Sequence, residues 1–238
     1  MRDPIAEAPH LHDANYYRLA YQLSAQRLNT VAGVLPHDDR LTTSDEVVEL
    51  LREWLAEAIA FSAEVTGVLR WHAQLEGEWR KSRLRRLRKY PLTAKDQRLR
   101  QFLSTTVAPC AELVVAGSYV FTGEPGLVWE WSAPVRERAR RGQLSYRAHY
   151  DLACLDSSIA GVLTGALDDY DDDPQPSYLA SSLASLRRSF ELSTGRRRQE
   201  LIGWAKDDPS LRPVRDLVPD EFAGLVEEFG YGARDRRR

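Results

Sequence analysis

The chain has 238 residues, 43% of them hydrophobic and 29% charged, and its formal net charge is -2. A chain of this length forms one or two domains with a substantial buried core. The near-neutral charge excludes a globally basic nucleic-acid-binding protein, and the abundance of apolar residues excludes wholesale disorder. Two cysteines, Cys110 and Cys154, are too few for a disulfide framework, which favours a reducing compartment.

Neither a secretion signal nor a transmembrane segment is expected. Residues 1–13 carry three acidic groups, two prolines and no apolar core, unlike a signal peptide. The longest apolar stretch, from Phe102 to Phe121, is interrupted by Pro109 and Glu112, whereas a transmembrane helix needs about 20 apolar residues in succession. Together with the cysteine usage, these features predict a cytoplasmic protein.

The N-terminal part of the chain predicts two helices. Residues 1–13 are expected to be a flexible arm, and apolar residues then recur every three or four positions over 16–31. Capping and acidic residues at 43–46 begin a second helix, whose apolar stripe continues toward residue 90. We therefore expect an N-terminal helical hairpin at 14–66 and a central helical region at 67–134.

The central region contains the ambiguous segments. A helical pattern begins at Thr93, and Pro109 either kinks this helix or separates two helices. Residues 113–121 suit a strand as well as a buried helix, and their helical neighbours favour a helix. Residues 127–131, with two tryptophans, suit a short strand or an anchored loop. A short irregular or β insertion is therefore expected near 122–134.

The C-terminal part, residues 135–229, predicts further helices. The helical pattern is clearest at 146–163 and at 178–192, and shorter helical pieces follow. A basic tail occupies 230–238. The predicted fold is all-α, with one helical domain at 14–229 built from antiparallel helical hairpins.

Two segments of the chain are similar to each other. Residues 17–25 read YRLAYQLSA, and residues 146–154 read YRAHYDLAC. The first, second, fifth and seventh positions match, and the last two are small in both. Small residues let two helices approach closely. The similarity indicates either two related hairpins or a coincidence between two amphipathic helices.

The later of these segments resembles a known motif. Residues 150–154, YDLAC, resemble the core of the first helix of a tetratricopeptide repeat, and residues 189–192, SFEL, resemble the end of its second helix. In this resemblance Leu186 takes a large position and Ser182 a small one. The segment 204–225, which contains DPSL and FAGL, is similar to the segment that closes the last repeat in many bacterial repeat proteins.

This resemblance covers roughly 145–229 and extends only weakly to 15–66. It departs from the family where His149 replaces the usual Trp and Thr194 the usual Pro, and no regular repeat period is present. It implies a TPR-like helical scaffold or adaptor that mediates protein–protein interaction, of a kind found in bacterial signalling and defence systems. The partner would be another protein or a second copy of the chain.

The sharpest charge feature lies at 80–100, where ten cations are opposed by one acid. Such a segment can bind nucleic acid or anionic lipid. The preceding stretch 45–78 holds eight acids and two arginines, which favours contact between a basic and an acidic helix, or docking of a partner. The alternative function is a nucleic-acid-binding protein that uses 79–100. The candidate partner-binding residues here are Arg80, Lys81, Arg83, Arg85, Arg86, Arg88 and Lys89.

An acidic loop follows the helical pattern at 146–163. Carboxylates suit calcium or magnesium, but the spacing, glycine and closing glutamate of an EF-hand are absent, so a solvated or partner-facing loop is favoured. The candidate partner-binding residues in this loop are Asp168, Asp169, Asp171, Asp172 and Asp173.

No contiguous catalytic motif is present. The chain lacks a P-loop, GxGxxG, GxSxG and HExxH. His10 and His12 have the spacing of metal ligands, but no second His or Cys cluster completes a site. Cys154 is expected to be a buried structural thiol. The sequence therefore predicts a protein that is not an enzyme and has no catalytic residue, metal or cofactor, although a noncontiguous site would leave no motif.

Overall fold

The computed structural model describes residues 14–34, 45–81, 93–166 and 175–230, and all regular secondary structure within them is helical. This confirms the all-α prediction. In chain order the elements are α1 (Ala14–Val34), α3 (Asp45–Lys81), α4 (Ala94–Phe102), the π-helix η3 (Leu103–Val107), α5 (Ala108–Thr122), α6 (Pro125–Arg140), α7 (Tyr146–Ala166), α8 (Gln175–Leu192), α9 (Gly195–Asp207), the 3-10 helix η4 (Pro209–Leu211), α10 (Arg212–Leu217) and α11 (Pro219–Gly230).

The expected irregular or β insertion near 122–134 is wrong, because α6 begins at Pro125 and runs through this segment. Gly123, at a positive φ of 72°, ends α5, and Pro125 suits the first turn of the next helix. The buried residues of α6 are Val128, Ser132 and Val135, which are four and three positions apart, as on one face of a helix. The preference for helix over strand at 113–121 is confirmed by α5.

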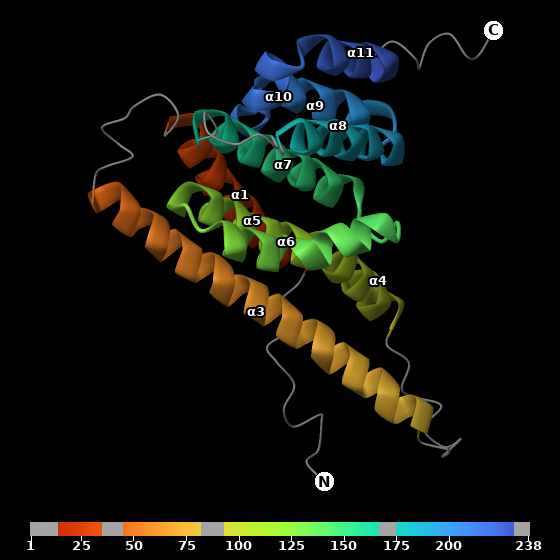
Figure 1. Cartoon of the computed structure of the whole chain (residues 1–238). Helices are drawn as coiled ribbons and strands as arrows, with labels where there is room; N and C mark the ends of the chain where they lie inside the picture. The colour runs from red at the N-terminus through yellow and green to blue at the C-terminus, as the bar shows by residue number, and fades with distance from the viewer. Residues whose placement is uncertain (1–13, 35–44, 82–92, 167–174, 231–238) are drawn as a thin grey trace, which may run out of the picture.

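Helix α3 is long and continuous. It runs without a break across residues 66 and 67, the boundary that we expected between the N-terminal hairpin and the central region. Figure 1 shows α3 along one side of the molecule, with α5 and α6 between it and α7. Helices α8 to α11 lie beyond α7, on the far side from α3.

Helix α7 separates two hydrophobic cores and contributes to both. Its residues Ala148, Leu152 and Leu155 are buried with the side chains of α1, α3, α5 and α6. Its residues Tyr150 and Ala153 are buried with those of α8 to α11. Because a helix turns by about 100° per residue, such alternation directs two apolar faces of α7 toward the two cores.

Helices α7 and α8 are antiparallel and packed closely. Ser182 Oγ donates to the carbonyl oxygen of Ala153 at 2.8 Å, and Ser189 Oγ donates to that of Tyr146 at 2.7 Å. From Tyr146 to Ala153 the chain advances seven residues along α7, and the contacting serines move back by seven residues along α8, from 189 to 182. This is the pattern of two antiparallel helices. Small side chains at 153 and 182, both fully buried, permit this close approach.

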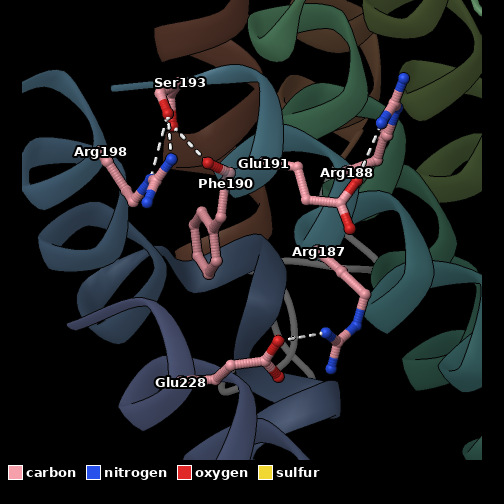
Figure 2. Close-up of polar contacts among 7 residues, drawn as sticks. All are labelled: Arg187, Arg188, Phe190, Glu191, Ser193, Arg198 and Glu228. Carbon is pink, nitrogen blue, oxygen red and sulfur yellow. Dashed lines mark hydrogen bonds and ion pairs between the residues drawn. The ribbon is translucent and has the colours of Figure 1, made fainter. Parts of the chain in front are cut away.

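Polar side chains hold the turns after α8 and α9. At the first turn Arg198 donates to the carbonyl oxygen of Ser193 through Nε and Nη2, at 3.1 and 2.6 Å (Figure 2). At the second, Arg215 donates to the carbonyl oxygens of Ala205 and Asp208. These carbonyls lie at or near helix ends, where the regular backbone hydrogen bonds of a helix are incomplete.

One helical run among the described residues, 94–122, is long and apolar enough to cross a membrane. Of its most apolar window, 78% is buried inside the fold, as in the core helix of a globular protein. A transmembrane segment is therefore not indicated.

Candidate functional site

The structure does not describe the side chains of the candidate partner-binding residues that the sequence suggested. Arg80 and Lys81 fall in the last turn of α3, but their side chains are outside the described part of the structure. The other basic candidates, Arg83, Arg85, Arg86, Arg88 and Lys89, and the acidic candidates, Asp168, Asp169, Asp171, Asp172 and Asp173, lie outside the described residues altogether.

One described cation from the end of the basic segment is used inside the fold. Arg100 of α4 forms an ion pair with Glu76 of α3. Both side chains are about a third exposed. The pair agrees with the expectation that part of the basic segment contacts the acidic helix before it.

The structure reveals a different charged site, a cleft of about 400 Å³ between α1, α7 and α9. Three guanidinium groups line it, those of Arg18, Arg147 and Arg197, one from each helix. We call it the arginine cleft. Among the described residues that line it, Glu200 is the one carboxylate, and it accepts a hydrogen bond from Arg196 at 2.9 Å. The cleft therefore carries a net positive charge.

A helix irregularity positions one wall of the arginine cleft. Pro109 lacks the N–H that would donate to the carbonyl oxygen of Thr105, and the chain forms the π-helix η3 just before it. The N–H of Ser145 donates to this carbonyl instead, at 2.9 Å. Ser145 Oγ accepts from the N–H of Ala148, so it caps α7. The positive end of the α7 dipole thus opens toward the cleft.

Arg147 packs against two aromatic rings. Its guanidinium carbon lies 5.1 Å from the ring centre of Trp204 and 5.4 Å from that of Tyr150. Its Nε lies 3.2 Å from Oδ1 of Asp151, one turn later on α7. Both members of this ion pair are largely buried, with side chains 19% and 10% exposed. Arg147 is therefore part of the cleft floor as well as a source of charge.

The other two arginines are less engaged. Arg197 Nη1 donates to the hydroxyl oxygen of Tyr146 at 2.8 Å, and its guanidinium lies 5.5 Å from the centre of the Tyr146 ring. Within the described residues, neither Arg197 nor Arg18 forms an ion pair with a carboxylate. A guanidinium offers five N–H donors, so both retain donors for an anionic ligand.

Arg147 also lines a second, smaller cavity of about 40 Å³, large enough for a water molecule. Asp208 lies at this cavity, where its Oδ2 accepts from the hydroxyl of Tyr150 at 3.0 Å and from the thiol of Cys154 at 3.7 Å. Burial raises the pKa of the Cys154 thiol well above its ordinary value, and burial does the same for Cys110. Both thiols therefore stay protonated at neutral pH, which suits packing rather than nucleophilic chemistry.

Sequence reasoning missed the arginine cleft because its charges are far apart in the chain. A signal was nevertheless present in the internal similarity between 17–25 and 146–154. Its matched arginines, Arg18 and Arg147, line the same cleft from two helices. Of the tyrosines at the matched positions, Tyr17, Tyr21 and Tyr150 are buried, whereas Tyr146 is half-buried at the cleft wall.

No group of three or more His, Cys, Asp or Glu side chains within the described ranges is arranged to hold a metal ion. No protein-family model matches the chain, and no curated protein or solved structure is significantly similar to it.

Proposed function

We propose that this protein is a non-catalytic helical scaffold or adaptor that binds another protein by receiving an acidic segment of that partner in the arginine cleft. The observation that carries the proposal is the convergence of Arg18, Arg147 and Arg197, from three helices, on one cleft where Glu200, the one carboxylate that lines it within the described ranges, is already paired. Guanidinium groups bind carboxylates through two parallel hydrogen bonds, which gives geometric selectivity as well as energy.

The walls of the cleft favour a peptide over a simple inorganic anion. Tyr21, Phe102 and Trp204 line the same cleft as the arginines. Trp204 keeps half of its surface exposed although it is the largest of the three. Aromatic side chains at a binding surface provide large contact areas at little entropic cost. An acidic segment that also carries an apolar side chain would use both features.

The resemblance of 145–229 to the tetratricopeptide repeat supports the same class of function. Paired helices in such repeats leave concave surfaces that receive peptides. The resemblance favours a role in a bacterial signalling or defence system. Both cysteines are free thiols, which is compatible with the reducing cytoplasm that we propose as its location. A second copy of the chain is the other partner that this scaffold role allows.

The proposal is tested by binding of a short fluorescein-labelled peptide in which glutamates surround one phenylalanine, measured by fluorescence anisotropy with the full chain. Arg18→Gln and Arg197→Gln together should weaken binding by at least about tenfold, since a hydrogen bond to a charged group contributes about 1.5–3 kcal/mol. Arg52→Gln and Arg212→Gln together are the matched control, because both are exposed arginines paired with a carboxylate on their own helix, Glu49 and Asp216. This control variant should leave the affinity unchanged.

Two results would contradict the proposal. The first is equal binding by the double variant and the unaltered protein. The second is an equal loss of affinity in the control variant with Arg52→Gln and Arg212→Gln, which would show attraction to overall charge only. The nucleic-acid alternative is tested with labelled single-stranded and duplex oligonucleotides. The nucleic-acid alternative replaces our proposal if the oligonucleotides bind and the arginine-cleft variants leave that binding unchanged. Changing Arg83, Arg85, Arg86 and Arg88 to Ser should then abolish oligonucleotide binding.

A further inference from the structure

A second cleft, of about 320 Å³, lies between α6, α7 and α8. We call it the α6–α8 cleft. Arg136, Arg140 and Arg188 line it, and no acidic side chain does so among the described residues. Ser181 and Ser185 add two hydroxyl-bearing side chains to its lining.

The α6–α8 cleft contains a buried imidazole that lacks hydrogen bonds. His149 of α7 lines the cleft and is 5% exposed, and neither of its ring nitrogens has a hydrogen-bond partner. Burial, assisted by the charge of Arg188, lowers the pKa of His149 to about 4, so the ring is neutral at pH 7 and carries one N–H donor. A buried donor without an acceptor is costly. Both ring nitrogens are closed to solvent, so an acceptor oxygen in this cleft removes that cost only if the ring turns toward it.

The three arginines of the cleft differ in their availability. Arg136 forms an ion pair with the fully buried Asp156, so it is committed to the fold. Arg140 pairs with Glu137 and Arg188 with Glu191, each three residues away on the same helix and with side chains roughly half exposed. Exposed pairs of this kind contribute only about 0–1 kcal/mol. An anion can therefore replace the glutamates at Arg140 and Arg188 at little cost.

We propose that the α6–α8 cleft binds a small phosphate monoester, whose phosphoryl group bridges Arg140 and Arg188, accepts a hydrogen bond from Ser185 and draws the His149 ring round to donate a second. Two forked cations and two neutral donors match a dianion with three acceptor oxygens better than a carboxylate, which one guanidinium satisfies. The cleft is larger than a phosphoryl group, and Ala139, Leu152 and Ala184 provide an apolar wall for the organic part of the ligand. This site is separate from the arginine cleft and does not depend on the proposed function.

The structure provides a matched control for this site. Arg187 and Arg188 are adjacent on α8, but their side chains lie on different faces of the helix (Figure 2). Arg187 Nη1 pairs with Glu228 of α11 at 2.7 Å, whereas Arg188 lines the α6–α8 cleft. Arg187→Gln and Arg188→Gln thus remove the same charge at nearly the same position in the chain.

The experiment is a titration of the full chain with phenyl phosphate at neutral pH, with phenol as the ligand that lacks the phosphoryl group. Isothermal calorimetry gives the affinity, and the imidazole NMR signal of His149, assigned by its loss in His149→Gln, locates the site. Arg188→Gln should weaken binding by about tenfold or more, and Arg187→Gln should not change it. The His149 signal should move on titration of the unaltered protein and of Arg187→Gln.

Several results would overturn the proposal. One is a His149 signal that does not respond to millimolar phenyl phosphate. Equal losses of affinity in Arg187→Gln and Arg188→Gln would show a response to net charge alone. Binding that is lost in Arg197→Gln but kept in Arg188→Gln would place the ligand in the arginine cleft. Equal affinities for inorganic phosphate and phenyl phosphate would refute the assignment to a monoester.

Discussion

Replacing Gly161 of α7 with Ala tests how closely α10 approaches α7. A Cβ atom at Gly161 would lie 2.6 Å from Cγ and 3.3 Å from Cβ of Pro213, in α10. The first distance is shorter than any normal carbon–carbon contact, and the proline ring cannot rotate away. In α3, by contrast, a Cβ atom at Gly67 would meet no atom within 4 Å. The two glycines are both inside helices, so they form a matched pair.

Two effects of opposite sign determine the change in the free energy of unfolding. Gly→Ala inside a helix stabilises by about 1 kcal/mol through helix propensity. Overpacking at Gly161 costs about 1–3 kcal/mol, because α10 must move away from α7. We therefore expect Gly67→Ala to stabilise the protein by about 1 kcal/mol. Gly161→Ala should leave stability unchanged or lower it by up to about 2 kcal/mol, the sum of the two effects.

Urea unfolding followed by far-UV circular dichroism measures both variants, and the shift of the midpoint at constant m gives the change in stability. Pro213→Ala and the double variant Gly161→Ala, Pro213→Ala complete a double-mutant cycle, in which Gly161→Ala should cost less stability once the ring is removed. If Gly161→Ala stabilises the protein as much as Gly67→Ala does, the close approach of α7 and α10 is refuted.

The remaining predictions concern buried charge and pH. Asp156→Ala leaves Arg136 without its carboxylate inside the fold, and should lower the free energy of unfolding by about 3–5 kcal/mol, whereas Asp216→Ala, which breaks the exposed pair with Arg212, should cost less than about 1 kcal/mol. Urea unfolding of the two variants checks this, and similar losses would contradict the burial of the first pair. The depressed pKa of His149 means that the unfolded chain takes up a proton below pH 6.5 that the folded chain takes up only near pH 4. Stability that is complete above pH 6.5 should therefore fall by at most about 3 kcal/mol as the pH decreases to 4. His149→Gln should flatten the profile over this range, and an unchanged profile would show that other groups cause the loss.

The fold class was predictable because helices leave a local signal. The spacing of apolar residues indicated α3, α7 and α8, and the preference for helix at 113–121 was right. The error at 127–131 has a local cause. Trp129 and Trp131 have high β propensity, but the burial of Val128 with Val135, seven residues later, requires a helix. Packing of α6 against α5 decides between strand and helix here, and residues 127–131 alone do not show which segment they pack against.

The charged surfaces were less predictable. The sequence directed attention to dense runs of charge at 80–89 and 168–173, because clustering along the chain is what a sequence displays. The arginine cleft instead combines Arg18, Arg147 and Arg197, which are separated by more than a hundred and by fifty residues. In the sequence, the one feature that relates Arg18 to Arg147 is the Tyr-Arg pair that begins both similar segments, 17–25 and 146–154.

By itself, the sequence determined that this protein is all-α, that Tyr150 and Leu152 belong to a helix with apolar sides, and that Ala153 suits a close helix contact. These properties depend on side-chain size and on periods of three or four residues, so a short stretch of sequence is enough to predict them. Only the tertiary structure decided which arginines share a cleft and which are neutralised by a buried carboxylate. The charge of a guanidinium is the same everywhere in the chain, but its use depends on the groups that packing places beside it.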